Sequence, residues 1–210
     1  SGYRPFGAQN AERFLADFGY RSQDSELHLI GQYGRSLLGV QGVTPQVLVA
    51  QQYNSVFTSP QTTNNQAGQV QLTGSFNVAP HWTINSNFYI RQFDQIHVDG
   101  NDADAVDCAD IDGNNGGTLC LSPGNVGAQY QNSALLQFIH NGQPIPSLGG
   151  DTDETAYGTT ARTYTHTTAI GTQQQVTNRD TFYGHDNFFV FGGAVDTSWT
   201  HFSSTTTLGQ

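Results

Sequence analysis

The stretch "GSFNVAPHWTINSNFYIRQF", residues 74–93, alternates apolar and polar side chains on both sides of a corner. The corner is Ala79-Pro80-His81, where proline removes no hydrogen bond from a strand ladder. Successive side chains of a strand point to opposite faces, so each arm has one apolar and one polar face. The apolar positions are Phe76, Val78, Trp82, Ile84, Phe88 and Ile90. The stretch therefore predicts a β-hairpin with an oily face and a face of Asn, Thr and Tyr.

The same two-residue rhythm recurs along the chain. It predicts strand hairpins at residues about 12–35, 68–93 and 157–201. Two long irregular connections separate them, at about 36–67 and 94–156. We therefore expect an all-β fold, an antiparallel up-and-down meander, in one segment that covers residues 1–210.

Within the two long connections, two short helical turns are expected. The first lies at 47–52, directly after Pro45, and the second lies at 133–140. Both are brief, so the connections keep the character of loops.

The composition narrows the class of protein. Charged residues make up 11% of the chain, and aromatic residues also make up 11%. A disordered chain is usually poor in aromatic residues, so the abundant Gly, Thr, Asn, Gln and Ser favour strands joined by turns. The formal net charge of −10 argues against a nucleic-acid partner, which requires a basic surface. It also argues against electrostatic docking on anionic lipid.

The sequence begins at Ser1 and contains no methionine, so we interpret it as a piece of a longer protein. It opens without the basic and apolar regions of a signal peptide. No apolar run approaches the roughly 18 residues that a membrane helix requires.

Several phrases resemble TonB-dependent outer-membrane receptors. They are "VFTSPQTT" (56–63), "RQFDQIHVDGNDAD" (91–104), "ERFLADFGYRSQDSELHL" (12–29) and "GHDNFFVFGGAVDTSWTHFSSTTTLG" (184–209). The stretch "HVDGNDADAVDC" (97–108) is similar to the start of an extracellular loop that holds a cysteine pair. The resemblance covers most of the chain and implies a portion of the wall of a large outer-membrane β-barrel, without the plug.

The order of the connections agrees with this resemblance. Short and long connections alternate, so in a meander the long ones gather at one end of the sheet. Outer-membrane barrels have short turns on one side and long loops on the other. The expected strands also reach the roughly 9–11 residues that cross a bilayer. On this interpretation Phe76, Trp82 and Phe88 face lipid, and Asn77 and Asn85 face a wet lumen.

The resemblance implies uptake of a scarce nutrient, such as a siderophore or an oligosaccharide, across the bacterial outer membrane. Its implied partners are outer-membrane lipid, the remaining barrel and plug of a parent receptor or neighbouring chains, and TonB through that parent only. Six strands cannot close a barrel, because a single-chain bacterial barrel needs at least eight. No enzyme activity is expected, since no nucleophile elbow, phosphate-binding loop or HExxH pattern occurs.

Cys108 and Cys120 are the two cysteines, and both lie in the second long connection. Two cysteines alone in a polar loop favour a disulfide over two free thiols. The same connection is rich in aspartate. Its carboxylates could supply the oxygen ligands that calcium prefers, although the EF-hand spacing is absent. The candidate calcium ligands are Asp99, Asp102, Asp104, Asp110 and Asp112.

Tyr89, Arg91 and Phe93 share one face of a strand that leads into this connection. In a receptor they would lie near the mouth, where Arg91 could bind a carboxylate or a hydroxyl-rich substrate. The alternative is that they only line the lumen.

Two other classes of function remain open. The chain could be a structural β-protein that assembles through its edge strands, because long Thr-, Gln- and Asn-rich strands offer unpaired backbone groups. It could also be a secreted, calcium-dependent carbohydrate-binding β-sandwich. Alternation alone is consistent with a barrel wall and with a sandwich. The apolar face points outward to lipid in the barrel, whereas it packs inward in the sandwich.

Overall fold

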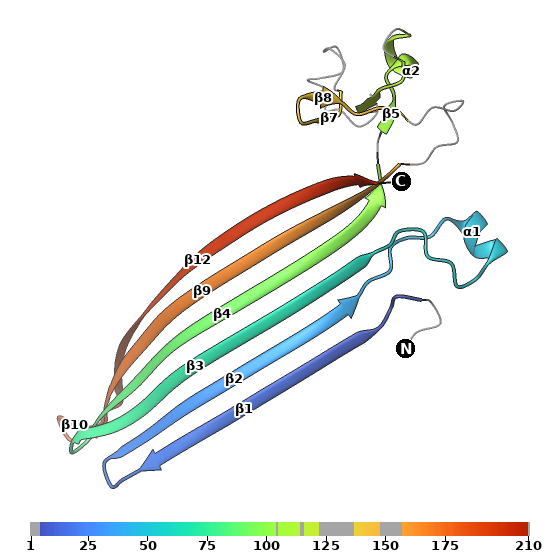
Figure 1. Ribbon diagram of the computed structural model, residues 1–210. Coiled ribbons are helices and arrows are strands. Elements are labelled where there is room, and N and C mark those ends of the chain that lie inside the picture. The colour runs from blue at the N-terminus through green and yellow to red at the C-terminus, as the bar shows by residue number, and fades with distance from the viewer. Residues whose placement is uncertain (1–4, 104, 114–115, 122–136, 148–156, 210) are drawn as a thin grey trace. The chain divides into compact units, whose positions relative to one another are not determined.

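The computed structural model describes residues 5–103, 105–113, 116–121, 137–147 and 157–209. Its main element is one six-stranded sheet with the order β1-β2-β3-β4-β9-β12 (Figure 1). These strands span Gln9–Arg21 (β1), Ser25–Gly39 (β2), Gln61–Ala79 (β3), Trp82–Asp102 (β4), Gly158–Asn178 (β9) and Phe189–Gly209 (β12). Neighbours in the sheet follow one another along the chain and run antiparallel. The expected all-β meander is therefore confirmed.

The register brings the apolar positions of neighbouring strands together. Phe18 lies opposite Leu29, and Leu29 lies opposite Leu72. Phe14 lies opposite Tyr33 in the same way. Since side chains two residues apart share a face, these pairs build one continuous apolar face across the strands.

The turns at one end of the sheet are short. Between β1 and β2, the Ser22 N–H donates to the Ser25 carbonyl, and Pro80 and His81 alone connect β3 to β4. His81 has a φ of 66°, in the left-handed region that tight turns use. Residues 179–188 join β9 to β12 and include the two-residue strands Thr181–Phe182 (β10) and His185–Asp186 (β11). The corner predicted at Ala79-Pro80-His81 is therefore confirmed.

The long connections are shorter than expected. The first runs over residues 40–60 rather than 36–67, and the second over 103–157 rather than 94–156. The polar run at 61–67 forms the start of β3, where strand pairing to β2 does not require an apolar side chain. The first connection contains α1, Gln46–Gln51, which confirms the helical turn predicted at 47–52.

The chain divides into two compact units. The sheet unit comprises Ser1–Val98 and Arg162–Thr205, and the loop unit comprises Asp99–Ala161 and Thr206–Gln210. The loop unit contains the following short elements: β5 (Ala105–Asp107), α2 (Ala109–Asp112), β6 (Leu119–Leu121), β7 (Ile139–His140) and β8 (Gln143–Pro144). Its small core consists of Ala103, Leu119 and Tyr157.

The helical turn predicted at 133–140 is wrong over its described part. Residues 133–136 lie outside the described residues, and Ile139–His140 pairs with Gln143–Pro144 as a hairpin. Asn141 and Gly142 have φ values of 51° and 77°. Asn-Gly is the pair that a tight hairpin turn favours, because both of its central residues take positive φ.

Candidate functional site

The apolar face of the sheet is uncovered. Phe18 is 72% exposed, Phe191 is 70% exposed and Trp199 is 57% exposed. Figure 1 shows the six strands side by side in a single layer, and α1, the described helix of the sheet unit, does not lie over them. Fully burying one such side chain contributes about 1.5–3 kcal/mol relative to leaving it exposed. An apolar face of this extent therefore needs a surface or a medium to cover it.

The sheet unit has almost no core of its own. Among its described residues, Ala169 is the only buried hydrophobic residue. A sheet that packs in a sandwich buries one of its faces. The sheet unit is held together by backbone hydrogen bonds between strands, and its own described residues bury neither face.

The opposite face carries polar side chains that bond between strands. The Gln71 amide donates to Asn87 Oδ1 at 3.0 Å, and the Gln95 amide donates to Asn65 Oδ1 at 2.8 Å. Gln71, Asn85, Asn87, Gln173 and Gln175 are among the residues that line a shallow depression of about 370 Å³ on this face. The face therefore presents amides and hydroxyls that water can solvate.

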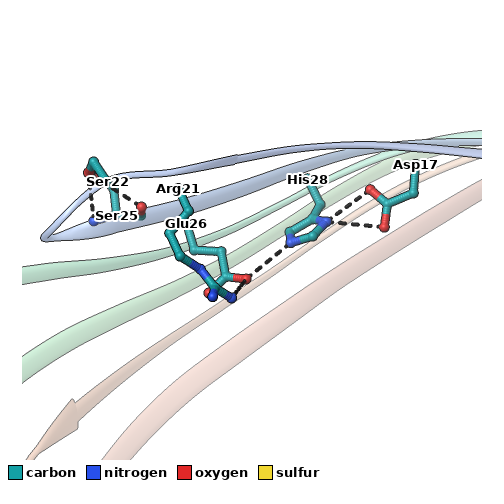
Figure 2. A network of polar contacts seen from close by, with 6 residues as sticks. All are labelled: Asp17, Arg21, Ser22, Ser25, Glu26 and His28. Carbon is teal, nitrogen blue, oxygen red and sulfur yellow. Dashed lines mark hydrogen bonds and ion pairs between the residues drawn. The ribbon is translucent and has the colours of Figure 1, made fainter.

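A charged network occupies the turn end of this polar face (Figure 2). His28 Nδ1 lies 2.9 Å from the Asp17 carboxylate, which accepts its hydrogen bond, and Glu26 lies 3.2 Å from the other ring nitrogen. Arg21 completes the row by donating to Glu26 at 2.5 Å. All four side chains come from β1 and β2, and Figure 2 shows them in one line beside the turn. Such a network ties the two strands together on the face where water can reach it.

The three substrate-binding candidates lie further along the same polar face. The Tyr89 hydroxyl donates to Asp196 on β12, and the ring lies across Gly171 of the intervening β9. The Arg91 guanidinium lies 5.9 Å from the centroid of the Tyr89 ring, within cation–π range. Tyr89 and Arg91 are thus brought together, and Phe93 follows on the same face by alternation. A substrate-binding role for these three residues stays a prediction.

The apolar face ends in a row of ionisable residues on the side of the long connections. Glu12 lies opposite Arg35 across β1 and β2. Asp94 lies 2.5 Å from His166 Nδ1 across β4 and β9. The change from Phe, Leu and Ile to these residues marks one limit of the apolar band.

The loop unit holds the two cysteines and the aspartates. Cys108 and Cys120 form a disulfide that links α2's N-terminus to β6, and both cysteines are completely buried. Asp107 joins α2 to the segment before β6, because its carboxylate accepts from the backbone N–H groups of Ala109 and Gly117. These bonds, with that of Ala109 the strongest, lower the pKa of Asp107 below its ordinary value.

The calcium site stays a prediction. Asp104 and the side chains of Asp102 and Asp112 lie outside the described residues. Asp99 lies in β4 and Asp110 lies in α2. Within the described ranges, no group of three or more His, Cys, Asp or Glu side chains could hold a metal ion.

Sequence reasoning missed Asp196, Asp17 and His28. Each lies on a polar strand face where nothing in the period-two pattern separates it from its neighbours. The cross-strand partners depend on register, which a single sequence gives only where a tight turn sets it.

None of the helices in the described residues is long and apolar enough to cross a membrane. No protein-family model matches the chain, and no curated protein matches it either.

Proposed function

We propose that this chain forms part of the wall of an outer-membrane β-barrel. Its apolar face would lie against lipid, and its polar face would line a water-filled interior. The observation that carries this proposal is the uncovered apolar face, opposite a face of hydrogen-bonded amides. Hydrocarbon covers Phe, Leu and Val side chains, whereas water on the same face would leave each of them exposed.

The height of the apolar band supports this placement. The Arg179 N–H donates to the His81 carbonyl, which sets Trp82 level with Asn178. The contact between Thr167 and Thr200 sets Trp199 level with Thr168. The two tryptophan rows are therefore ten residues apart along β9, from position 168 to position 178.

Ten residues at a rise of about 3.3 Å span about 33 Å along a strand. At the strand tilt of about 40° that is usual for membrane barrels, this projects to about 25 Å. That is about the height of the apolar band in membrane barrels. The two tryptophans would lie at its two borders, where Trp is enriched.

The two edge strands of the sheet lack a partner on one side, so the proposed wall requires further strands. In the described residues β1 pairs with β2 alone and β12 pairs with β9 alone. Unpaired backbone groups are costly in hydrocarbon, so a membrane wall must continue beyond both strands. We propose that the remaining strands and the plug belong to a parent receptor.

The particular receptor class proposed is the TonB-dependent receptor of the bacterial outer membrane. It is supported by the resemblance in sequence, by the gathering of long connections at one end and by the cysteine pair in the longer of them. The parent would import a scarce nutrient, a siderophore or an oligosaccharide, and no covalent bond would change. Tyr89 and Arg91 would face the path of that nutrient, and TonB would contact the parent outside this segment.

The test uses the two tryptophans of the chain as depth probes in lipid vesicles, at chain densities that let the free edges of neighbouring copies pair. The variants Trp82→Phe and Trp199→Phe each leave one tryptophan. We expect both remaining tryptophans to be quenched by lipids brominated near the headgroup, and more weakly by lipids brominated at the chain end. Iodide in the water should quench neither efficiently.

A matched control places a single tryptophan on the polar face. Asn85→Trp, in a chain with both native tryptophans replaced by Phe, should respond to iodide and ignore brominated lipid. If all three probes respond to iodide alone, the chain does not lie in the bilayer and the proposal fails.

A second candidate function is assembly through edge strands, as a structural β-protein. The free edges of β1 and β12 favour it, since each offers a row of unpaired backbone groups. It predicts lipid-free particles much larger than one chain. A preparation that is monomeric in the absence of detergent and lipid would exclude it.

A further inference from the structure

Two arginines border one hollow of the sheet. Arg13 of β1 and Arg91 of β4 both line a depression of about 500 Å³ that extends over four strands. We call this depression the arginine hollow. Both arginine side chains are exposed, so they reach solvent and are not part of a packed core. A volume of this size falls within the roughly 300–1,000 Å³ that is usual for small-molecule sites.

Alternation places the arginine hollow on the polar face. Arg13 lies four residues before Asp17 on β1, and Arg91 lies four residues after Asn87 on β4. Residues an even number of positions apart share a face of a strand, and Asp17 and Asn87 both belong to the polar face. On the proposed membrane placement, the arginine hollow therefore opens to the water-filled interior.

Small residues keep the space between the two arginines open. Arg13 lies opposite Gly34, and Gly34 lies opposite Ala67. A Cβ added at Gly34 would meet only the carbonyl oxygen of Glu12 within 4 Å, at 3.9 Å. The backbones of β1 and β4 are three strand spacings apart, about 14 Å. A small ligand can therefore lie between the two guanidinium groups.

Neither guanidinium is neutralised by a neighbouring carboxylate. In the described part of the chain, no Asp or Glu oxygen lies within 4.0 Å of Arg13 or Arg91. Asp196 is on the same face, and it accepts the hydrogen bond of the Tyr89 hydroxyl. The whole chain carries a formal net charge of −10, so two unpaired cations at one hollow are a local exception. They favour an anionic ligand.

The geometry of arginine narrows the class of anion. A guanidinium donates two parallel N–H groups to one carboxylate, so each arginine can hold one carboxylate in a bidentate pair. Two arginines on opposite sides of a hollow suit a ligand with carboxylates at two of its ends. Gln32 and Gln69 lie directly opposite each other between them and line the same hollow. Their amides can bond further oxygens of such a ligand.

The arginine hollow lies at the loop-side border of the apolar band. Asp94 contacts His166 across the antiparallel strands β4 and β9. Two residues along this pairing, the position next to Arg91 is level with Thr168, and Thr168 is level with Trp199. Trp199 marks the border of the band on the side of the long connections. A ligand that arrives from that side would reach the arginine hollow near the entrance of the interior.

We propose that the arginine hollow binds a small ligand with two or more carboxylates, one held by Arg13 and another by Arg91. This inference rests on the proposed function, because it requires the polar face to line water. It also narrows that function, since it makes the imported nutrient an anion and not a neutral oligosaccharide.

The experiment is a calorimetric titration of the full chain in vesicles of zwitterionic lipid with tricarballylate, a small tricarboxylate. The wild type should bind tricarballylate and should not bind its trimethyl ester. Arg13→Gln and Arg91→Gln should each weaken the affinity by about 10- to 100-fold, the effect of losing one charge-assisted hydrogen-bonded pair. Arg91→Lys, which keeps the charge but loses the planar fork, should fall between Arg91→Gln and the wild type.

Arg35→Gln is the matched control. Arg35 adjoins Gly34 on β2 but points to the opposite face, where it lies opposite Glu12. The substitution removes the same charge without touching the arginine hollow, so the affinity should change by less than about twofold. An equal loss in Arg35→Gln and Arg13→Gln would show that only the overall charge matters, and would overturn the proposal.

Two further ligands test whether both arginines act together. Propionate carries one carboxylate and should bind at least about 10-fold more weakly than tricarballylate, because it can engage only one guanidinium. Inorganic phosphate should also bind more weakly, since it is too small to reach both arginines. Phosphate or propionate that binds as tightly as tricarballylate would exclude a site for two carboxylates.

The outcomes separate this inference from the function on which it rests. The tryptophan quenching described above, repeated with each variant, reports whether the chain lies in the bilayer. If the tryptophans respond to brominated lipid but the wild type binds tricarballylate no better than Arg13→Gln and Arg91→Gln do, the membrane placement stands and the carboxylate site is excluded. If they respond to iodide alone, the membrane placement fails, and this inference fails with it.

Discussion

The sheet unit and the loop unit differ in where their apolar side chains go. In the loop unit Leu119, Tyr157 and Ala103 turn toward one another and are buried. In the sheet unit Phe18, Phe191 and their neighbours turn outward and stay exposed. The loop unit is therefore held by a small core and a disulfide, whereas the sheet unit is held by backbone ladders and by whatever covers its apolar face.

On the proposed membrane placement, the two units depend on different media for their stability. A small unit that folds in water needs a core or a covalent link, and the loop unit has both. The sheet unit has neither among its described residues, and on the proposed membrane placement its stability depends on lipid. Substitutions can test the two halves of the comparison separately.

The largest effect is expected from a charge on the apolar face. Phe88→Arg places a guanidinium in the middle of the band and should destabilise the membrane-bound form by about 2–4 kcal/mol. Asn85→Arg, on the polar face, is the matched control and should cost far less, since water can solvate it. Denaturant titration in vesicles measures both. Equal losses would show that the two faces share one environment.

The second-largest effect on stability is expected from removal of the disulfide. Replacing Cys108 and Cys120 together by Ser should destabilise the loop unit by about 3 kcal/mol, because the closed loop no longer limits the unfolded chain. Hydrogen exchange should rise at the amides of β5 and β6 and stay unchanged in β1 and β2. Similar losses in both units would contradict their independence.

A smaller effect is expected from the bond between Tyr89 and Asp196. Tyr89→Phe removes one hydrogen bond between β4 and β12 and should cost about 1 kcal/mol. A double-mutant cycle with Asp196→Asn isolates the coupling between the two side chains. Additive single effects, measured by denaturant titration, would show that the two side chains do not interact.

The smallest effect concerns Asp107 and depends on pH. Its pKa is lower in the folded loop unit than in the unfolded chain, so the carboxylate stabilises the fold above the unfolded pKa. That contribution is lost as the pH falls through the folded pKa, in the acid range below about 4. Hydrogen exchange at Ala109 and Gly117 should accelerate there.

Asp107→Asn is the control for this pH dependence. It removes the titrating group, so exchange at Ala109 and Gly117 should no longer change with the ionisation of residue 107. If the wild type and Asp107→Asn follow the same pH profile, the carboxylate does not hold the loop.

Much of the sheet could be predicted because its signals are local. Alternation gave the faces of residues 74–93, and Pro80 gave the position of the turn. The start of β3 was missed, since its polar side chains carry no alternation between oily and polar. The Asn141-Gly142 hairpin was missed although its turn signal is strong, because a helical turn was expected from the residues before it.

Less of the candidate site than of the sheet could be predicted from the sequence. Tyr89 and Arg91 could be placed on one face, but Asp196 is more than a hundred positions away. The amide of Gln174 belongs to a strand of mixed Thr and Gln residues, where neither face is plainly apolar. On the same strand, the position of Thr172 beside Phe88, Ile90 and Val195 follows only once β4, β9 and β12 are paired.

The sequence by itself determined that the chain is a β-meander with one apolar and one polar face. Alternate residues of a strand point to opposite faces, so the order of apolar and polar residues shows both faces directly. Tertiary structure alone decided that nothing described in the sheet unit covers the apolar face and that Ser86, Gln174 and Thr172 are joined by hydrogen bonds within it. Both depend on which strands are neighbours and in what register they pair. Backbone hydrogen bonds can join any two strands, so the residues of one strand do not by themselves identify its neighbour; that choice depends on contacts between residues far apart in the chain.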